Sequence, residues 1–160
     1  MKHYWIPKRS TALVPLLFLS LTLLPAMAGD QEALVKQYFA LWNSGEVAAA
    51  DRLLHTDFVR HTMPRDSKLA GIQAFKDDLT RVLDGSKGMK IQVVEVVTSG
   101  DRSTVRWVME GTQSSSNRSF KVPGISLLRS ADGKLIEELA YWDNLSLYNQ
   151  MGFRLSPPKK

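Results

Sequence analysis

The sequence predicts a single α+β domain, a cone-shaped and barrel-like fold in which a strongly curved, mixed or antiparallel sheet wraps around N-terminal helices. Two observations lead to this prediction. Apolar residues recur every three or four positions in the first half of the domain, as in helices, and alternate with polar residues in the second half, as in strands. The chain has 160 residues, 44% of them hydrophobic, which is enough for one core. A sheet that curls around helices leaves an apolar cavity, a common place for a small-molecule site.

Residues 1–28 have the three zones of a secretory signal peptide. The segment begins with the basic residues Lys2, Lys8 and Arg9. Thr11–Leu24 is an apolar run of 14 residues, shorter than the roughly 20 that span a membrane. Ala26-Met27-Ala28 places small residues where a signal peptidase reads them. We therefore expect cleavage after Ala28, a periplasmic or secreted location and no stable membrane insertion; an uncleaved N-terminal anchor is the alternative. Residues 29–155 then form the domain, and 156–160 a disordered tail.

Helices are expected first in the domain. The predicted helices cover Asp30–Asn43, Glu46–His55 and Gly71–Leu83. Asp30 is a plausible N-cap of the first helix, which ends before Gly45. His55 is expected in the last turn of the second helix, where a cation suits the helix dipole. Asp57–Met63 is predicted as a short extended piece.

Four strands joined by hairpins are expected in the second half. The predicted strands are Met89–Thr98, Ser103–Gln113, Phe120–Arg129 and Lys134–Trp142. The connectors contain turn residues, as in Ser99-Gly100-Asp101 and Ala131-Asp132-Gly133. Leu145–Met151 is predicted as a last short helix, and Gly152 suits a left-handed C-terminal cap.

Composition excludes several classes of function. The chain has no cysteine, which removes disulfides, thiol nucleophiles and thiolate-bound zinc. Cleavage of the leader would reduce the 21 basic residues to 18 against 16 acidic ones, so the domain is nearly neutral and nucleic acid is not an expected partner. The two histidines of the domain, His55 and His61, lack helical pair spacing and do not suggest a metal site. No phosphate-binding or dinucleotide glycine motif is present, so no cofactor is expected.

A series of motifs resembles one known family. In chain order they are Tyr38–Gly45 with Ala48–Leu54, Asp57–His61, Gly71–Phe75, Gly100–Thr112, Val122–Ser126, Asp132–Glu137 and Tyr141–Gly152. Together they cover nearly all of residues 31–153 and resemble the SnoaL-like polyketide cyclases, within the cone-shaped group that includes nuclear transport factor 2, ketosteroid isomerase and limonene epoxide hydrolase. Two departures concern the cavity mouth: Gln113 stands where many relatives have histidine, and the hairpin at Ser114–Asn117 is short.

Asp143 is the first catalytic candidate. It is an acid flanked by aromatic and apolar residues. In the cyclases, as the resemblance implies, an aspartate at this place is the general acid/base of an intramolecular aldol closure. A carboxyl group in a dry cavity can take a proton from a carbon acid and return it. The alternative is that Asp143 only caps the helix that follows.

His61 and Gln113 are the candidate polar helpers. His61 lies at a strand end, where it could orient a carbonyl group or share a proton with Asp143; the alternative is a half-exposed histidine at a strand end. Gln113 lies on the same strand face as Trp107 and Met109, and its amide could donate to an enolate oxygen. A polar residue entering a hairpin is the other interpretation of Gln113.

Large apolar and aromatic residues are expected to line the cavity. The predicted set is Tyr38, Trp42, Met63, Phe75, Trp107, Met109 and Tyr141. Outward apolar residues of the strands, such as Val94, Val96 and Val108, predict a second covered face and hence a homodimer, which the resemblance also implies.

These observations support a cofactor-independent acid/base enzyme, an aldol-type cyclase or isomerase, acting on a small apolar carbonyl compound. An exported, non-catalytic binding module for a lipophilic molecule or a protein partner is the alternative. A third option, an epoxide hydrolase, would require several carboxylates around a water. A cavity-facing Asp143 would favour the enzyme, and an exposed Asp143 the binding module.

Overall fold

The structure, a computed structural model, describes residues 26–63, 67–154 and 156. The predicted leader therefore lies outside the described residues except for its last three positions, and so does most of the predicted tail. The helices are α1 (Ala26–Ser44), the 3₁₀ turn η1 (Val47–Ala49), α2 (Ala50–Leu53), α3 (Ile72–Asp84) and α4 (Asn144–Gln150). The strands are β1 (Leu54–Thr62), β2 (Ser67–Ala70), β3 (Ser86–Ser99), β4 (Arg102–Gln113), β5 (Ser119–Ala131) and β6 (Lys134–Trp142).

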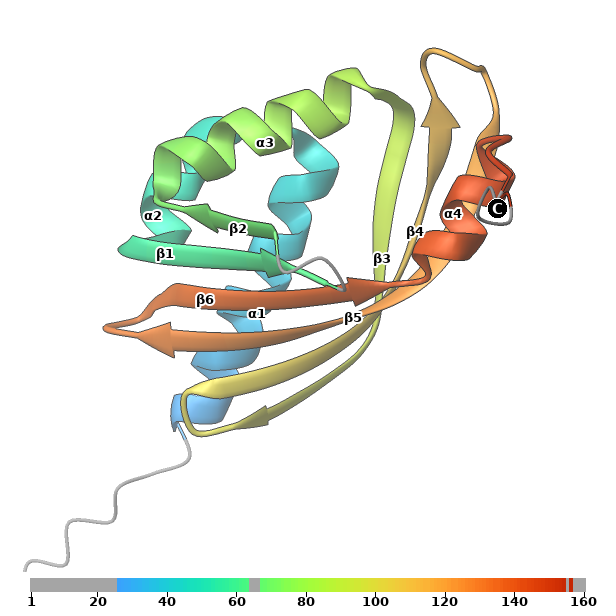
Figure 1. Cartoon of the computed structure of the whole chain (residues 1–160). Helices are drawn as coiled ribbons and strands as arrows, with labels where there is room; N and C mark the ends of the chain where they lie inside the picture. Colours follow the sequence, from blue (N-terminus) through green and yellow to red (C-terminus); the bar gives the residue numbers. More distant parts are fainter. Residues whose placement is uncertain (1–25, 64–66, 155, 157–160) are drawn as a thin grey trace, which may run out of the picture.

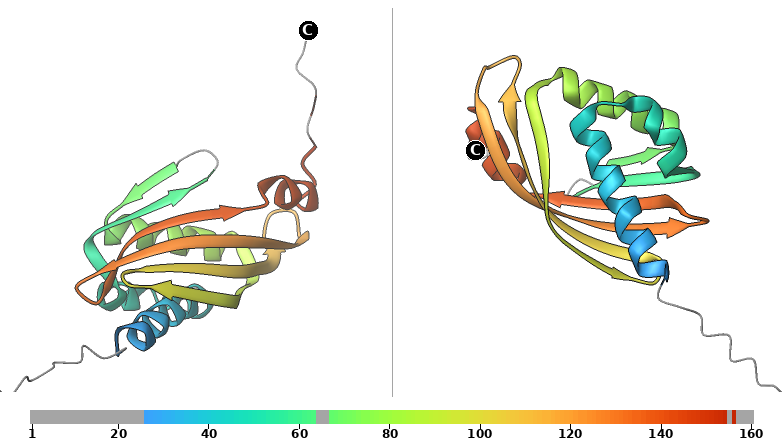
Figure 2. Two further views of the ribbon diagram at one scale, coloured as in Figure 1. Left: turned by 90° about the horizontal axis from the view of Figure 1, so that it is seen from below. Right: turned by 180° about the vertical axis from the view of Figure 1, so that it is seen from behind.

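One mixed sheet forms the wall of the cone. Its strand order is β2-β1-β6-β5-β4-β3, and its neighbours are antiparallel except for the parallel pair β1 and β6. The sheet is strongly curved and does not close, so β2 and β3 are its edges (Figure 1). Helix α1 crosses the concave face, and α3 lies beside it (Figure 2). The predicted α+β fold with a curved, mixed sheet is confirmed.

The helix boundaries differ from the prediction at two places. Helix α1 begins at Ala26, so Asp30 lies inside it and is not its N-cap. The second helix ends at Leu53 because Leu54 is already extended, fully buried and paired with Leu135 of β6. His55 therefore belongs to β1, where its Nδ1 accepts the backbone N–H of Asp57 at 3.1 Å.

Strand β2 was not predicted. It is four residues long, mostly exposed, and pairs with the end of β1, with Val59 opposite Ala70. Such a short polar segment carries no alternation, so only the backbone of β1 beside it makes it a strand.

Strand β3 contains an irregularity that reverses one predicted orientation. The register with β4 shifts between Val93 and Glu95, which leaves Val94 exposed. An extra residue in one strand exchanges the two faces beyond it. Val96 consequently packs against the core instead of pointing outward, opposite buried Val105.

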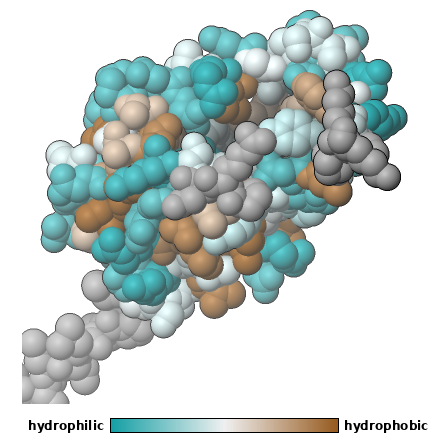
Figure 3. Space-filling view, viewed as in Figure 1, coloured by the Kyte–Doolittle hydropathy of each residue, from teal (hydrophilic) through white to brown (hydrophobic). Residues whose placement is uncertain are grey.

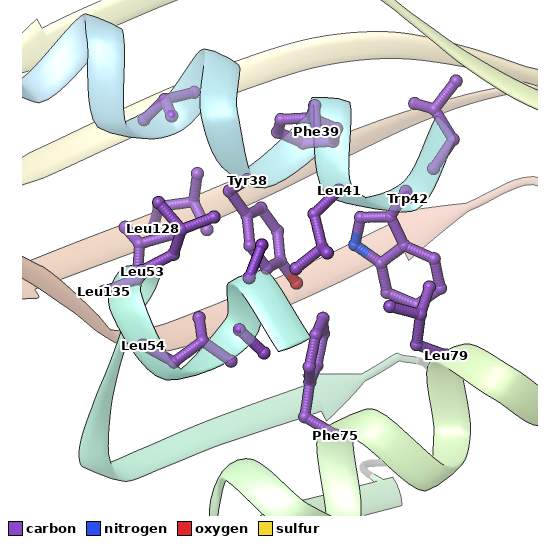
Figure 4. Packing of buried hydrophobic residues seen from close by; sticks show 14 of the residues in the cluster. Tyr38, Phe39, Leu41, Trp42, Leu53, Leu54, Phe75, Leu79, Leu128 and Leu135 are labelled. Carbon is purple, nitrogen blue, oxygen red and sulfur yellow. The ribbon is translucent and has the colours of Figure 1, made fainter. Parts of the chain in front are cut away.

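An aromatic cluster fills the space between the helices and the sheet (Figure 4). Tyr38 of α1, Phe58 of β1 and Phe75 of α3 have no exposed surface, and their ring centroids lie 5.6–6.4 Å apart. Trp42 contacts Phe75 edge-on at 5.5 Å. Rings in tilted and edge-to-face contact at these distances are favourably packed. This cluster holds α1 and α3 on the concave face and forms the closed end of the cone.

Candidate functional site

Beyond the aromatic cluster, the cone encloses a cavity of about 460 Å³. Its apolar lining comprises Phe39, Trp42, Leu69, Val82, Met89, Ile91, Trp107, Met109, Phe120, Trp142, Leu147, Tyr148 and Met151. Its polar lining includes Arg60, Thr62, Ser67, Asp78, Arg81, Ser86, Gln113 and Glu138. A mostly apolar pocket with a few polar groups is typical of a site for a small organic molecule.

Two tryptophans, from β4 and β6, form part of this wall. The rings of Trp107 and Trp142 lie 6.4 Å apart. Trp107 donates its Nε1–H to Ser126 Oγ at 2.9 Å, which fixes its ring. A side chain at position 124 would lie 2.2 Å from the Trp107 ring, so this ring requires Gly124.

The polar part of the wall includes a buried carboxylate, Glu138, which is 2% exposed. Its Oε2 accepts hydrogen bonds from Tyr38 Oη at 2.5 Å and from Arg60 Nε at 2.7 Å, and its Oε1 accepts one from Ser126 Oγ at 2.7 Å. Burial raises the pKa of Tyr38 well above its ordinary value, and the negative charge of Glu138 raises it further. Tyr38 is therefore a stable donor to Glu138.

Arg60 is held from three sides. Besides its bond to Glu138, it donates from Nη1 to Asp78 Oδ2 at 3.2 Å, and its Cζ lies 4.8 Å from the centre of the Trp42 ring. Burial by itself would lower the pKa of Arg60, but Glu138 and Asp78 outweigh it and raise this pKa above its ordinary value. Arg81 also donates to Asp78, from the solvent side. The cavity wall thus contains a permanently charged guanidinium with two carboxylate partners.

Four of the predicted site residues line the cavity together. They are Trp42, Trp107, Met109 and Gln113. The Oε1 of Gln113 accepts a hydrogen bond from Ser116 Oγ at 2.6 Å. The NH₂ group of Gln113 has no hydrogen-bond acceptor among the residues that the structure describes, so it is available as a donor.

The other predicted lining residues lie elsewhere. Tyr38 and Phe75 are buried in the aromatic cluster. Met63 does not line the cavity, and its carbonyl accepts a hydrogen bond from Asn144. Tyr141 is 38% exposed on the convex face, because side chains alternate along β6 and it is Trp142 that points inward.

His61 is on the opposite face of β1 from the cavity. Its neighbours Arg60 and Thr62 both line the cavity, and alternation turns His61 away from it. His61 is partly buried. The inward position of this strand is therefore Arg60, one residue before the predicted one.

Asp143 is exposed and caps α4. Its Oδ1 accepts the backbone N–H of Ser146 at 2.8 Å, and its carbonyl accepts that of Leu147. Asp143 is not among the residues that line the cavity. The structure thus shows the capping geometry that was the alternative interpretation, and it does not bring Asp143, His61 and Gln113 together.

Sequence reasoning missed the Arg60, Glu138 and Asp78 cluster. One signal was present. Glu138 lies at an inward position of β6, and Leu135 and Ala140 of the same strand are fully buried. An acid at such a position requires a buried partner. No spacing in the sequence identifies Arg60 as that partner.

Two further features of the described residues concern possible partners. No group of three or more histidine, cysteine or acidic side chains lies close enough to hold a metal ion within the described ranges. Of the helices that the structure describes, none has the length and apolar character needed to cross a membrane.

Comparison with solved structures shows the same fold. A candidate SnoaL-like polyketide cyclase from Jannaschia sp. CCS1 is 19% identical, with a TM-score of 0.71 over 81% of this chain and 94% of that one. IdmH from Streptomyces antibioticus, a candidate polyketide cyclase, is 20% identical, with a TM-score of 0.69 over 77% and 99%. A protein of ketosteroid isomerase-like fold from Catenulispora acidiphila DSM 44928, solved with trimethylamine, is 19% identical, with a TM-score of 0.70 over 78% and 97%.

No curated protein matches the chain significantly. The model of one protein family, however, matches residues 32–151, which is most of the chain and contains every residue of the cavity wall. This match agrees with the resemblance that the sequence motifs carry and with the fold of the solved structures. The chain belongs to the SnoaL-like polyketide cyclase family.

Proposed function

We propose that the domain binds a small, largely apolar carbonyl compound in its cavity. The observation that carries this proposal is the kind of polar group that the wall leaves available. The oxygens of Glu138 and the Oε1 of Gln113 already accept hydrogen bonds, whereas the NH₂ group of Gln113 can donate. A ligand that presents an oxygen acceptor on an apolar body matches such a wall.

Intrinsic fluorescence tests this binding directly. Three of the four tryptophans, Trp42, Trp107 and Trp142, line the cavity, so a bound ketone should change their emission in a saturable way. Met109→Trp should fill the cavity and abolish the effect. Val97→Trp adds the same chromophore on an exposed site, and should leave binding intact. A panel of cyclic and aromatic ketones that gives no saturable change would contradict the proposal.

A second candidate function is a cofactor-independent cyclase or isomerase, which the family match favours. Asp143 would act as general acid/base on the bound carbonyl compound, with Gln113 of the cavity wall as its polar helper. Leu147 and Tyr148 of α4 line the cavity, so a substrate that extends along this helix would approach its capping residue. The non-catalytic alternative is favoured by the exposure of Asp143 and by its capping bond.

Asp143→Asn separates these two candidates. Asparagine keeps the cap but removes the titrating group. For a substrate found among the bound ketones, loss of general acid/base catalysis should reduce turnover by roughly 10²–10⁴-fold. Asp57→Asn, a change of the same kind at an exposed residue outside the cavity lining, is the control. Full turnover in Asp143→Asn would exclude this role for Asp143.

Export is part of the proposal and rests on residues 1–28 of the sequence. Mass spectrometry of protein expressed with its own leader should find a chain that begins at Gly29. A chain that retains Met1 would refute cleavage.

A further inference from the structure

We propose that Arg60 is the residue that binds the ligand's oxygen, and that the ligand is a neutral ketone or ester rather than a carboxylate. This inference rests on the proposed binding of a carbonyl compound in the cavity. It adds a residue that neither the motifs nor the sequence pattern indicated.

The first argument is that Arg60 is preorganised. Its side chain is 13% exposed, and Glu138, Asp78 and the Trp42 ring fix the guanidinium from three different elements. A donor that is already ordered loses little conformational entropy when a ligand binds. The lining of the cavity includes Arg60 itself, so this fixed group faces the space that a ligand would occupy.

The second argument is the number of donors that remain. A guanidinium has five N–H groups. Arg60 uses one on Glu138 and one on Asp78, and none of the other three has an acceptor among the described residues. The Arg60 nitrogens are not among the buried side-chain atoms that lack a partner, so the unused N–H groups keep accessible surface. An oxygen of a ligand in the cavity can accept a hydrogen bond from them.

The third argument concerns charge. The positive charge of Arg60 is already balanced by two carboxylates, Glu138 and Asp78. Arg81, which also pairs with Asp78, is 73% exposed, so solvent screens its charge. A ligand carboxylate would bring a further buried negative charge without a buried cation to pair with it, whereas a neutral carbonyl oxygen needs only the hydrogen bond.

A matched pair of ligands tests this inference. 2-Acetylnaphthalene and 2-ethylnaphthalene have nearly the same shape and differ in the carbonyl oxygen. Equilibrium dialysis against the whole chain should show that the ketone binds about tenfold or more tightly than the hydrocarbon, the usual range for a hydrogen bond to a charged group. Arg60→Lys keeps the positive charge for Glu138 but loses the planar fork. It should reduce this preference to about threefold or less while binding of the hydrocarbon is retained.

The control is Arg129→Lys. Arg129 pairs with Glu137 at 3.0 Å on the same sheet and does not line the cavity, so the Arg129→Lys variant should keep the full ketone preference.

A second measurement needs no variant. The ¹³C resonance of the labelled carbonyl carbon should move downfield when the ketone binds the wild-type chain, as it does on hydrogen bonding to a cation.

The outcomes separate this inference from the proposed function. If neither naphthalene compound binds, the proposed function is refuted, and the role of Arg60, which rests on it, is refuted as well. If both bind equally to the wild-type chain, or the carbonyl resonance does not move, the cavity binds apolar ligands but Arg60 is not the oxygen ligand. A preference that persists in folded Arg60→Lys, or that is lost equally in Arg129→Lys, also overturns the role of Arg60.

Discussion

Glu138 shows how a single residue determines the chemistry of the cavity wall. A buried carboxylate is stable only when hydrogen bonds and a counter-charge compensate its lost hydration. Glu138 obtains these from Tyr38, Ser126 and Arg60, which come from α1, β5 and β1. Because its oxygens are engaged, the wall offers donors rather than a free base.

The raised pKa of Tyr38 gives a prediction about alkaline pH. Tyrosine ionises near pH 10 in the unfolded chain, whereas folded Tyr38 stays protonated because burial and Glu138 raise its pKa. Its contribution to stability is therefore present below pH 10 and is lost as the pH rises from there through the folded pKa. Between about pH 9 and 11, the absorbance change of tyrosine ionisation should be the same in Tyr38→Phe as in the wild type.

A reduced change in folded Tyr38→Phe would show that Tyr38 ionises normally and would contradict the prediction.

At the scale of the element, α4 depends on polar contacts. None of its seven residues is buried, yet two of them, Leu147 and Tyr148, line the cavity. Gln150 exchanges two hydrogen bonds with the backbone of Lys121 in β5, Asn144 donates to the carbonyl of Met63, and Asp143 caps the first turn. Short helices without buried apolar residues are not stable by themselves. These contacts therefore position this part of the cavity wall.

The cap is expected to have a measurable effect on stability. Asp143→Ala removes the acceptor of the Ser146 N–H and should lower the free energy of unfolding by about 0.5–2 kcal/mol. Asp143→Asn should change it little, because asparagine is an equally good cap. Urea denaturation of the three chains measures both values. Equal stability of the alanine variant would show that α4 does not need this cap.

At the scale of the whole molecule, the convex face of the sheet carries exposed apolar side chains. Ile125, Leu127 and Tyr141 are 39%, 45% and 38% exposed on neighbouring strands β5 and β6. Apolar side chains are visible among hydrophilic ones in the region of these strands (Figure 3). The concave face is covered by helices, so nothing within the described chain covers this one. We therefore propose a homodimer through the convex face.

Light scattering tests this assembly. The wild-type chain should have the mass of a dimer at micromolar concentration, and Leu127→Glu should be monomeric because it would bury an unpaired charge in the interface. Gln37→Glu adds the same charge on the exposed side of α1 and should remain dimeric. A wild-type monomer at this concentration would refute the proposal.

The sequence by itself determined the fold class and the approximate limits of most elements. Local periodicity carries this information, because burial on one face of a helix or strand selects apolar residues at that element's own spacing. The positions of Trp42, Trp107, Met109 and Gln113 on the cavity wall followed from the same pattern. Predictions failed where a shift of one residue decides which face a side chain points to. Trp142 lines the cavity instead of Tyr141, and Arg60 instead of His61. Val96 points inward, not outward, because it follows the bulge of β3.

Only the tertiary structure decided which polar groups meet. Asp78 and Glu138 follow Arg60 by 18 and 78 positions in the chain, and no local pattern relates the three residues. They come together because β1 pairs in parallel with β6 while α3 packs across β1, a consequence of the whole topology. For the same reason, the sequence allowed two roles for Asp143, catalysis or capping, but could not decide between the two positions of its side chain. The direction of a capping side chain depends on where α4 packs against β5.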